Sequence, residues 1–154
     1  VPSESALSAL VLRLGADVPV CFRGQSCWMR GIGEVLVEGP KFSSLHALLI
    51  NPGIPVSTPK IFEKLKGRFS AEEDRTTDFF TYEDLVRYLR KTGNDLQLPA
   101  ISLVPDISNC INALAAEPGC YFSGMSGSGA TCFGLYQDRS DAEQASKKIK
   151  EIHT

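Results

Sequence analysis

Between residues 124 and 131, three glycines and three hydroxyl-bearing residues share eight positions, Gly124-Met125-Ser126-Gly127-Ser128-Gly129-Ala130-Thr131. Glycines let successive backbone N–H groups point into one concavity and hydroxyls add further donors, so this loop suits a phosphate or carboxylate oxygen. It is not a Walker loop, because no Gly-Lys-Ser/Thr ends it and no helix is predicted directly after it. By itself the segment is equally consistent with a tight hairpin whose glycines satisfy positive φ.

A second candidate is the carboxylate of Asp17, within Gly15-Ala16-Asp17-Val18-Pro19. A helix end would deliver this side chain into a turn just before an apolar strand, where it could accept a proton. The alternative is an Asx turn that only closes the helix, and the five residues alone favour that alternative.

A third candidate lies between Pro55 and Phe62. We expect Thr58 to be the N-cap of a helix, with Pro59 at its first helical position. The helix N-terminus could hold an anion while Phe62 offers a flat face to a base. The alternative is a capped helix with a core phenylalanine. A further polar segment, Asn94-Asp95-Leu96 after Gly93, is interpreted as a helix cap.

Composition favours a soluble globular protein with no special partner surface. Of 154 residues, 43% are hydrophobic and 22% charged, and the net charge is -2, so we expect neither nucleic acid nor membrane as a partner. The first residues form neither a signal peptide nor a transmembrane segment, and the chain is expected to begin within a longer protein. Five cysteines, an odd number without metal-ligand spacing, suggest reduced packing residues in a cytoplasmic protein, with no metal site: Cys21, Cys27, Cys110, Cys120 and Cys132.

The elements that position these residues fall into two predicted domains, residues 1–44 and 45–154, because the polar stretch 38–44 is the best boundary candidate. In the first, apolar spacing predicts a helix from Ser3 to Leu14, and short strand-like runs cover 18–22, 27–29 and 35–37.

The second predicted domain interleaves strands and helices. Strands are expected at 46–50, 120–122 and 131–136, and helices at 58–66, 81–92, 106–117 and from 140 onward. The strand-loop-strand pair around the glycine-rich loop implies an antiparallel hairpin, so the fold class is α+β, a sandwich and not a doubly wound parallel sheet.

Taken in order, five segments resemble the 4-diphosphocytidyl-2-C-methyl-D-erythritol kinases of the GHMP superfamily: Leu14-Gly15-Ala16-Asp17-Val18-Pro19, Gly31-Ile32-Gly33-Glu34, Val56-Ser57-Thr58, Asn94-Asp95-Leu96 and Ser126-Gly127-Ser128-Gly129-Ala130-Thr131. The resemblance covers nearly the whole chain. It implies the ferredoxin-like α/β sandwich of a GHMP carboxy-terminal domain, preceded by the last elements of the amino-terminal domain.

The resemblance also implies an activity. Such an enzyme moves the γ-phosphate of ATP, with magnesium, onto the 2-hydroxyl of a cytidine diphosphate-linked substrate in the non-mevalonate isoprenoid route. Asp17 matches the family's catalytic aspartate. Cofactor binding falls to Gly124, Ser126, Gly127, Ser128, Gly129, Ala130 and Thr131, and substrate binding to Thr58, Pro59 and Phe62.

One departure limits this expectation, because the family's principal ATP loop, Pro-X3-Gly-Leu-Gly-Ser/Gly-Ser-Ser in form, is absent from these residues. The chain is therefore expected to be an inactive fragment whose partner is the missing amino-terminal part of the same protein. Two alternatives stay open: a GHMP kinase for another small alcohol, and a non-catalytic nucleotide-binding module.

Overall fold

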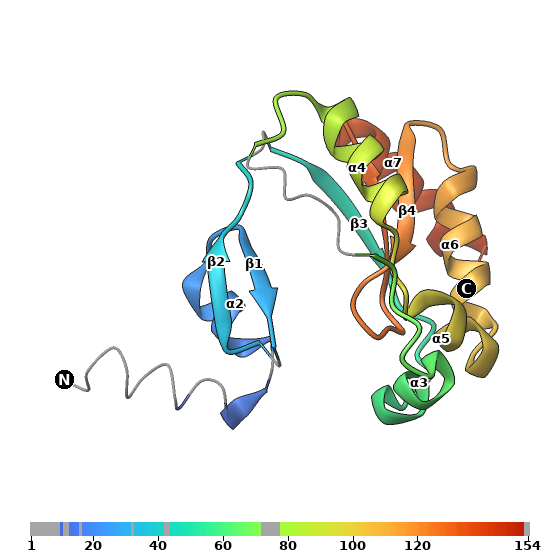
Figure 1. Ribbon diagram of the computed structural model, residues 1–154. Helices are drawn as coiled ribbons and strands as arrows, with labels where there is room; N and C mark the ends of the chain where they lie inside the picture. The colour runs from blue at the N-terminus through green and yellow to red at the C-terminus, as the bar shows by residue number, and fades with distance from the viewer. Residues whose placement is uncertain are drawn as a thin grey trace. The chain divides into compact units, whose positions relative to one another are not determined.

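The computed structural model describes residues 10, 13–15, 17–31, 33–41, 44–71 and 78–152 (Figure 1). The chain divides into two compact units, Val1–Phe42 with Arg75–Thr81, and Ser43–Asp74 with Tyr82–Thr154. Most of the helix predicted from Ser3 to Leu14 lies outside the described residues.

The first unit contains helix α2 (Val18–Arg23) and an antiparallel hairpin of β1 (Cys27–Arg30) and β2 (Val35–Glu38). The hairpin confirms the strands predicted at 27–29 and 35–37. The strand predicted at 18–22 is wrong. Pro19 lies in the first helical turn, where its fixed φ and missing N–H are tolerated, and Gly24 ends the helix with a φ of 63°. Pro19 and Gly24, as helix boundary residues, outweigh the strand preference of the apolar run between them.

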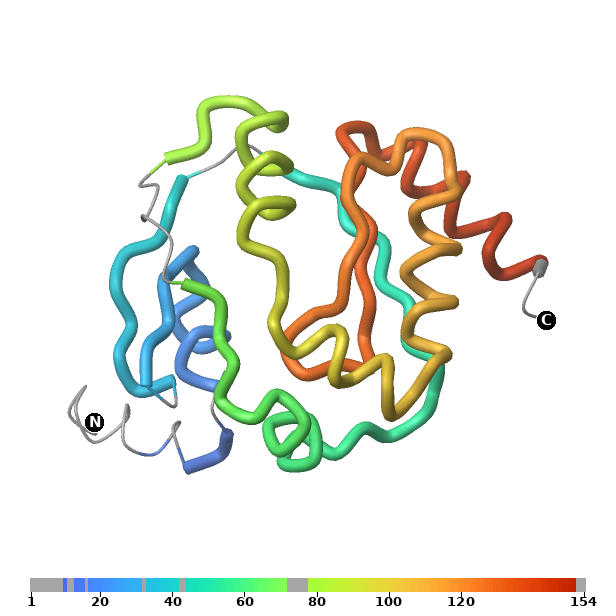
Figure 2. Tube along the Cα trace, turned by 45° about the vertical axis from the view of Figure 1, so that its right-hand side comes forward, coloured from blue at the N-terminus to red at the C-terminus, as the bar shows by residue number. Residues whose placement is uncertain are grey.

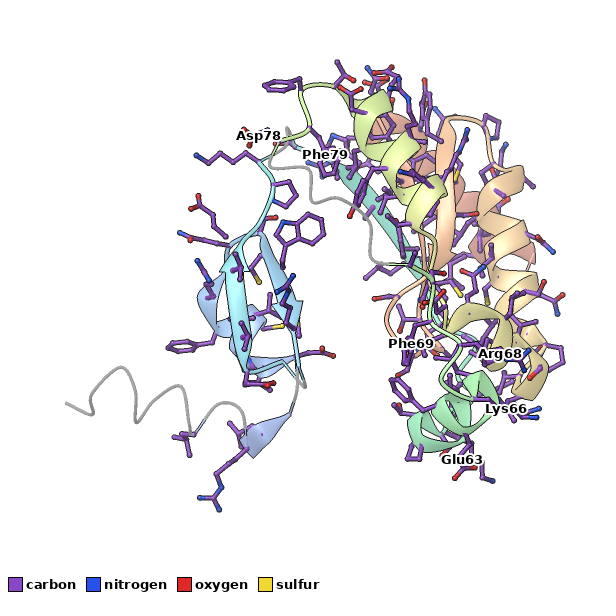
Figure 3. All side chains as sticks on the ribbon, viewed as in Figure 1. Glu63, Lys66, Arg68, Phe69, Asp78 and Phe79 are labelled. Atoms are coloured by element: carbon purple, nitrogen blue, oxygen red, sulfur yellow. The ribbon has the colours of Figure 1, made fainter. Side chains whose placement is uncertain are left out.

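Asp78 and Phe79, which also belong to the first unit, pair with Lys41 just after the hairpin. Lys41 and Asp78 form a parallel bridge, and the Phe79 N–H donates to the Lys41 carbonyl at 3.0 Å. The Asp78 carboxylate accepts from the Lys41 N–H at 3.2 Å. Phe79 is buried, and Figure 3 labels it beside Asp78.

The second unit is built on a three-stranded sheet of β3 (His46–Ile50), β4 (Cys120–Met125) and β5 (Cys132–Tyr136). Their order is β3-β5-β4, and both neighbouring pairs run antiparallel. The hairpin of β4 and β5 confirms the predicted α+β class. β4 extends three residues beyond the predicted strand, up to the glycine-rich loop.

Five helices of the second unit are α3 (Thr58–Leu65), α4 (Tyr82–Thr92), α5 (Gln97–Leu103), α6 (Asp106–Ala116) and α7 (Arg139–Ile152). The prediction that Thr58 is an N-cap is wrong, because Ser57 holds that position with extended backbone and Thr58 is the first helical residue. Gly93, with a φ of 62°, follows the end of α4 as predicted. Among the helices that the structure describes, none has the length and apolar content needed to cross a bilayer.

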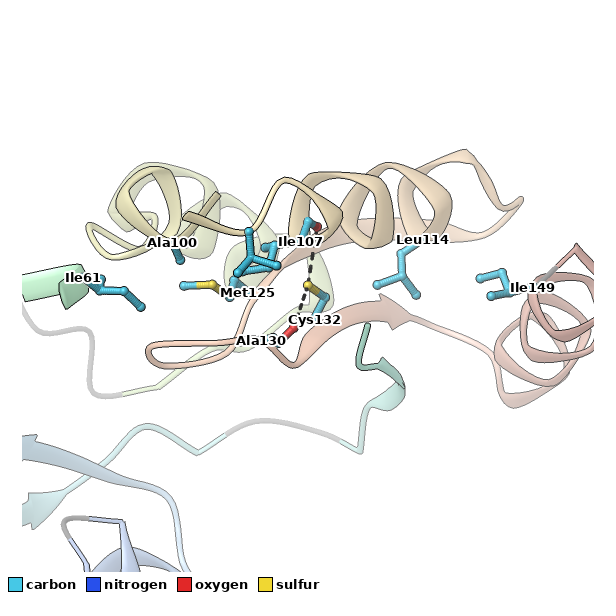
Figure 4. Close-up of a cluster of buried hydrophobic side chains, with 9 residues drawn as sticks. Ile61, Ala100, Ile107, Leu114, Met125, Ala130, Cys132 and Ile149 are labelled. Atoms are coloured by element: carbon cyan, nitrogen blue, oxygen red, sulfur yellow. Dashed lines mark hydrogen bonds between the residues drawn. The ribbon is translucent and has the colours of Figure 1, made fainter. Parts of the chain in front are cut away.

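Buried side chains separate onto the two faces of the sheet. One cluster joins α6 and α7 to the sheet through Ile107, Leu114, Cys132 and Ile149 (Figure 4). The other joins α4 to the opposite face through Tyr82, Val86 and Leu135. Successive residues of β5 alternate between the clusters, as strand geometry requires. Ala145 and Ile149 of α7 face inward as predicted.

The elements that surround the glycine-rich loop meet at one end of this sheet. Figures 1 and 2 both show α3 and α5 close to the loop that joins β4 to β5. α3 packs against α5 there, with Ile61 and Ala100 fully buried in the shared core. Three segments far apart in sequence therefore position one small region.

Candidate functional site

The loop between β4 and β5 closes on itself through two backbone hydrogen bonds. The Ser126 N–H donates to the Thr131 carbonyl and the Gly129 N–H to the Ser126 carbonyl, both at 2.9 Å. Within the described part of the chain, the N–H groups of Gly127 and Ser128 donate to no backbone carbonyl. These two consecutive donors are therefore free to bind an anionic oxygen.

Two glycines in the loop have backbone conformations that other residues adopt only with strain. Gly127 has a φ of 53° and Gly129 a φ of 84°. At Gly129 space is limiting as well, because an added Cβ would lie 2.7 Å from the Met125 sulfur. The hairpin interpretation and the anion interpretation therefore describe the same backbone, since the turn that needs glycine also exposes the N–H groups.

Hydroxyl groups from two segments meet at the loop. The Thr58 and Ser128 hydroxyls lie 2.9 Å apart, joining the start of α3 to the loop. The Thr131 hydroxyl accepts a hydrogen bond from the Asn51 side-chain amide at 2.9 Å. Two separately predicted candidate segments, one around Thr58 and one between residues 124 and 131, are thus brought together.

Asn94 and Gln97, which sequence reasoning did not assign to the site, hold the loop from its other side. The Asn94 amide donates to the carbonyls of Met125 and Gly127, at 3.0 and 2.8 Å. The Gln97 carbonyl oxygen accepts from the Met125 N–H at 3.0 Å. The interpretation of Asn94 as a helix cap is wrong, because Leu96 holds the N-cap position of α5 and no side chain makes a capping hydrogen bond there. The Asn94 side-chain oxygen accepts from the Leu96 N–H at 3.0 Å in the turn before the helix, and its amide anchors the loop.

Beside the loop lies an open cavity of about 550 Å³. Its lining includes Phe62, Phe69, Ser126, Gly127 and Asn94. Phe62 is 46% exposed, so the alternative that it is a core residue is wrong. The ring lies on the outer face of α3, whose buried face carries Ile61 and Leu65. Pro59, in the first turn of the same helix, is also exposed.

Asp95, next to Asn94, holds a neighbouring segment. Its two carboxylate oxygens accept from the Ser70 N–H at 2.9 Å and the Ser70 hydroxyl at 2.5 Å. The hydrogen bonds from the Ser70 side chain and backbone hold the pKa of Asp95 below its ordinary value. The carboxylate that makes these bonds is therefore ionised at neutral pH.

Asp17 belongs to the first unit. It occupies the N-cap position of α2, with a φ of -87°, and makes no side-chain capping hydrogen bond. Its carbonyl accepts from the Cys21 N–H at 3.1 Å, and its side chain is exposed. The turn is therefore held by backbone, which leaves the carboxylate free of any capping role.

The five cysteines are all free thiols. Burial raises the pKa of Cys132 to about 11, and its thiol donates toward the Ile107 and Ala130 carbonyls (Figure 4). Burial also raises the pKa of Cys110 and of Cys120. These three side chains stay protonated at neutral pH, which suits packing and not nucleophilic attack.

Residues 80–153 match the family model described as GHMP kinases C terminal. A 4-diphosphocytidyl-2-C-methyl-D-erythritol kinase of Cereibacter sphaeroides (strain ATCC 17025 / ATH 2.4.3) is 43% identical over 149 residues, which are 95% of this chain and 53% of that protein. The kinase of the same name from Rhodospirillum rubrum is 39% identical over 97% of this chain and 49% of its own length. The chain spans about half the length of the curated relatives it matches.

A solved structure agrees with these relatives. A crystal structure of 4-(cytidine 5'-diphospho)-2C-methyl-D-erythritol kinase superposes with a TM-score of 0.70 at 28% identity, covering 97% of this chain and 55% of that one. The family model includes the glycine-rich loop and α5 but begins after α3, whereas the relatives match over nearly the whole chain. Residues 80–153 therefore match the carboxy-terminal domain of GHMP kinases, and nearly the whole chain is similar to about half of a 4-diphosphocytidyl-2-C-methyl-D-erythritol kinase.

Proposed function

We propose that this chain is part of a cytoplasmic kinase that transfers the γ-phosphate of ATP to the 2-hydroxyl of 4-diphosphocytidyl-2-C-methyl-D-erythritol, a step in isoprenoid synthesis. The observation that carries the proposal is the glycine-rich loop, whose Gly127 and Ser128 N–H groups have no backbone acceptor among the described residues. The names of relatives 38–43% identical to the chain support the choice of substrate.

The loop contributes positioning and charge stabilisation to phosphoryl transfer. The phosphates would lie against the free N–H groups of the loop, with the Ser128 and Thr131 hydroxyls beside them. Asn94, Asn51 and Thr58 hold the loop in place through the hydrogen bonds described above. Because phosphoryl transfer depends mainly on fixed geometry and electrostatics, a preorganised loop of this kind suits the reaction.

Asp17 is proposed as the catalytic base. Its carboxylate would orient the 2-hydroxyl of the substrate and accept its proton as the new bond to phosphorus forms. The exposed side chain without a capping bond supports this role, because a base must be free to contact its substrate. The proton of the 2-hydroxyl passes to the Asp17 carboxylate. The bond between the γ-phosphorus and the bridging oxygen of ATP breaks, and ADP leaves with its electron pair.

Thr58, Pro59 and Phe62 are proposed as substrate-side residues. The half-exposed ring of Phe62 lines the cavity next to the loop and could stack on the cytosine. Stacking of this kind contributes about 1–3 kcal/mol per base in other proteins. Thr58 joins this wall to the loop through its contact with Ser128.

Magnesium is expected to bind together with ATP. Within the described part of the chain, no group of three His, Cys, Asp or Glu side chains gathers to hold a metal ion. The described residues therefore do not form a magnesium cage of their own. The ion bound to ATP usually takes most of its ligands from phosphate and water.

The test is a kinase assay on the complete protein with ATP and the cytidyl substrate. Asp17→Asn should lower kcat by about 10²–10⁴, the usual contribution of a general base. Asp138→Asn, at an exposed position between β5 and α7, is the matched control and should leave kcat unchanged. Wild-type turnover by Asp17→Asn would overturn the role of Asp17.

Two other functions remain distinguishable by experiment. A GHMP kinase for another small alcohol would turn over mevalonate, homoserine or a sugar faster than the cytidyl substrate. A non-catalytic module would bind ATP or a cytidine diphosphate derivative in calorimetry without forming product. The kinase proposal also implies that the principal ATP loop comes from a part of the protein outside these 154 residues.

A further inference from the structure

We propose that Asn51 is a positioning residue for phosphoryl transfer, because its side-chain amide keeps the Thr131 hydroxyl as a hydrogen-bond donor to a phosphate oxygen of ATP. The inference rests on the proposed function for the presence of ATP at the glycine-rich loop. It goes beyond the holding of the loop, since it gives the bond between these two side chains a direction that matters. Asn51 lies outside the five segments that resemble the family.

Asn51 reaches the loop because the sheet places it there. Ile50, the last residue of β3, pairs with Cys132, the first residue of β5, in an antiparallel register. The next pair along the same register is Asn51 with Thr131, and their side chains meet at 2.9 Å. The contact therefore continues a strand pairing, and a site supported by strands is held more precisely than one supported by loops alone.

The orientation of the Asn51 amide is fixed by the turn that follows. Its oxygen accepts from the Gly53 N–H at 2.8 Å. Pro52 has no N–H, so Gly53 is the first residue after Asn51 that can make this bond. Because the oxygen is used in the turn, the nitrogen faces Thr131, and an amide nitrogen can only donate. A flipped amide would set two N–H donors against each other at Gly53.

The direction of the bond decides what the Thr131 hydroxyl can do. A hydroxyl has one hydrogen to donate and two lone pairs that accept. One lone pair of Thr131 takes the Asn51 N–H, and within the described part of the chain no acceptor is found for the hydroxyl hydrogen. The hydrogen is therefore left for a ligand. A phosphate oxygen suits it, because hydrogen bonds to charged acceptors are about twice as strong as neutral ones.

Thr131 also lies where a phosphate held by the loop would be. Its carbonyl accepts from the Ser126 N–H at 2.9 Å, so Thr131 closes the loop that carries the free Gly127 and Ser128 N–H groups. The Ser128 hydroxyl is less constrained, since either it or the Thr58 hydroxyl could donate in their contact. Of these two side-chain contacts at the loop, only the one with Asn51 sets which group donates.

A structural role and a positioning role of Asn51 predict different results for Asn51→Asp. Asp has nearly the shape of Asn, and its carboxylate can still accept from the Gly53 N–H. It can still bond Thr131, but only as the acceptor, so the hydroxyl hydrogen is drawn away from the phosphate. The link between the ends of β3 and β5 is kept. Since Asn51 is exposed, the melting temperature should change little in this variant.

The experiment measures kcat/KM for ATP, and ATP affinity by calorimetry, in the complete protein. Asn51→Asp should lower both by about tenfold to a hundredfold, the range of a hydrogen bond to a charged group. Asn51→Ala leaves the Thr131 hydroxyl free to rotate and should lower them by about twofold to tenfold. Asn112→Asp, on the exposed side of α6, makes the same chemical change away from the loop and is the matched control.

Thr131 variants test whether the effect passes through the hydroxyl. Thr131→Val removes the hydroxyl and should lower kcat/KM for ATP as much as Asn51→Asp, whereas Thr131→Ser keeps it and should stay within about threefold of wild type. In the Thr131→Val background, Asn51→Asp should add less than about twofold, because the effects of two residues that act through one contact do not add. KM for the cytidyl substrate should stay the same in every variant.

The outcomes separate this inference from the proposed function. Wild-type kcat/KM and ATP affinity in Asn51→Asp would refute the positioning role and leave the kinase proposal standing. A loss that persists in full in the Thr131→Val background would also refute it, because charge repulsion alone would then explain the loss. If wild type shows no turnover with the cytidyl substrate, the kinase proposal fails, and ATP affinity in the same variants still decides the role of Asn51. A wild type that binds no ATP would refute both.

Discussion

Replacing Asn94 by alanine should loosen the glycine-rich loop, because the Asn94 side-chain amide binds two of its carbonyls. The substitution removes two donated hydrogen bonds, to Met125 O at 3.0 Å and to Gly127 O at 2.8 Å. It also removes the acceptor of the Leu96 N–H. Asn94→Asp keeps that acceptor but places a carboxylate oxygen against the same two carbonyl oxygens, so it should loosen the loop at least as much as Asn94→Ala.

The magnitude follows from the burial of the groups left behind. Each hydrogen bond contributes about 0.5–1.5 kcal/mol net, and a buried carbonyl left unsatisfied costs about 1–3 kcal/mol. Gly127 is exposed, so water can replace its bond, whereas Met125 is 3% exposed. We therefore expect Asn94→Ala to destabilise the closed loop by about 2 kcal/mol, and Asn94→Asp to destabilise it by at least as much.

Hydrogen exchange of the loop amides measures this change directly. The Ser126 and Gly129 N–H groups are bonded within the loop, and a loss of about 2 kcal/mol should speed their exchange roughly 30-fold. The kcat/KM of the complete protein should fall by a similar factor if the loop positions the phosphates. Asn112→Ala, on the exposed side of α6, is the control. Unchanged exchange in both Asn94 variants would refute the anchoring role.

Three further predictions concern the backbone and the core. Gly129→Ala should abolish turnover and lower the melting temperature, because the added Cβ meets Met125 Sδ at 2.7 Å and the φ of 84° is strained; normal turnover would contradict the packing described for the loop. Lys66→Gly should stabilise the protein by roughly 0.5–1 kcal/mol, since Lys66 ends α3 with a φ of 54°, and a lower urea midpoint would contradict this. Leu114→Ala should destabilise by about 2–5 kcal/mol in urea unfolding, because this side chain is fully buried, and a change below about 1 kcal/mol would contradict its place in the core.

Local patterns in the sequence predict most of the second unit. The apolar spacing of α4 and α7 and the glycines at helix ends each have a local physical cause, and the structure confirms the elements they indicate. Where the patterns conflict, local rules fail. In the apolar run from Val18 to Phe22, strand propensity competes with Pro19 and Gly24 as helix boundary signals, and the helix forms.

The contacts that build the site could not be predicted from local patterns, because they join residues far apart in the chain. Thr58 meets Ser128 across 70 positions, and Asn94 reaches the loop across more than 30. The types of residue at Thr58 and in the loop singled out both segments as candidates, and the structure brings them into contact. Asn94 lies in one of the segments that resemble the family, but its local pattern suggested only a cap, since nothing in its neighbours indicates which carbonyls its amide will contact.

The most direct test of the central claim is phosphorus NMR of the complete protein mixed with ATP, magnesium and 4-diphosphocytidyl-2-C-methyl-D-erythritol. We predict a new phosphomonoester resonance on the cytidyl substrate that grows as ADP forms, and faster turnover than with mevalonate, homoserine or a sugar. The absence of that resonance, or faster phosphorylation of any of the other alcohols, would contradict the proposed function.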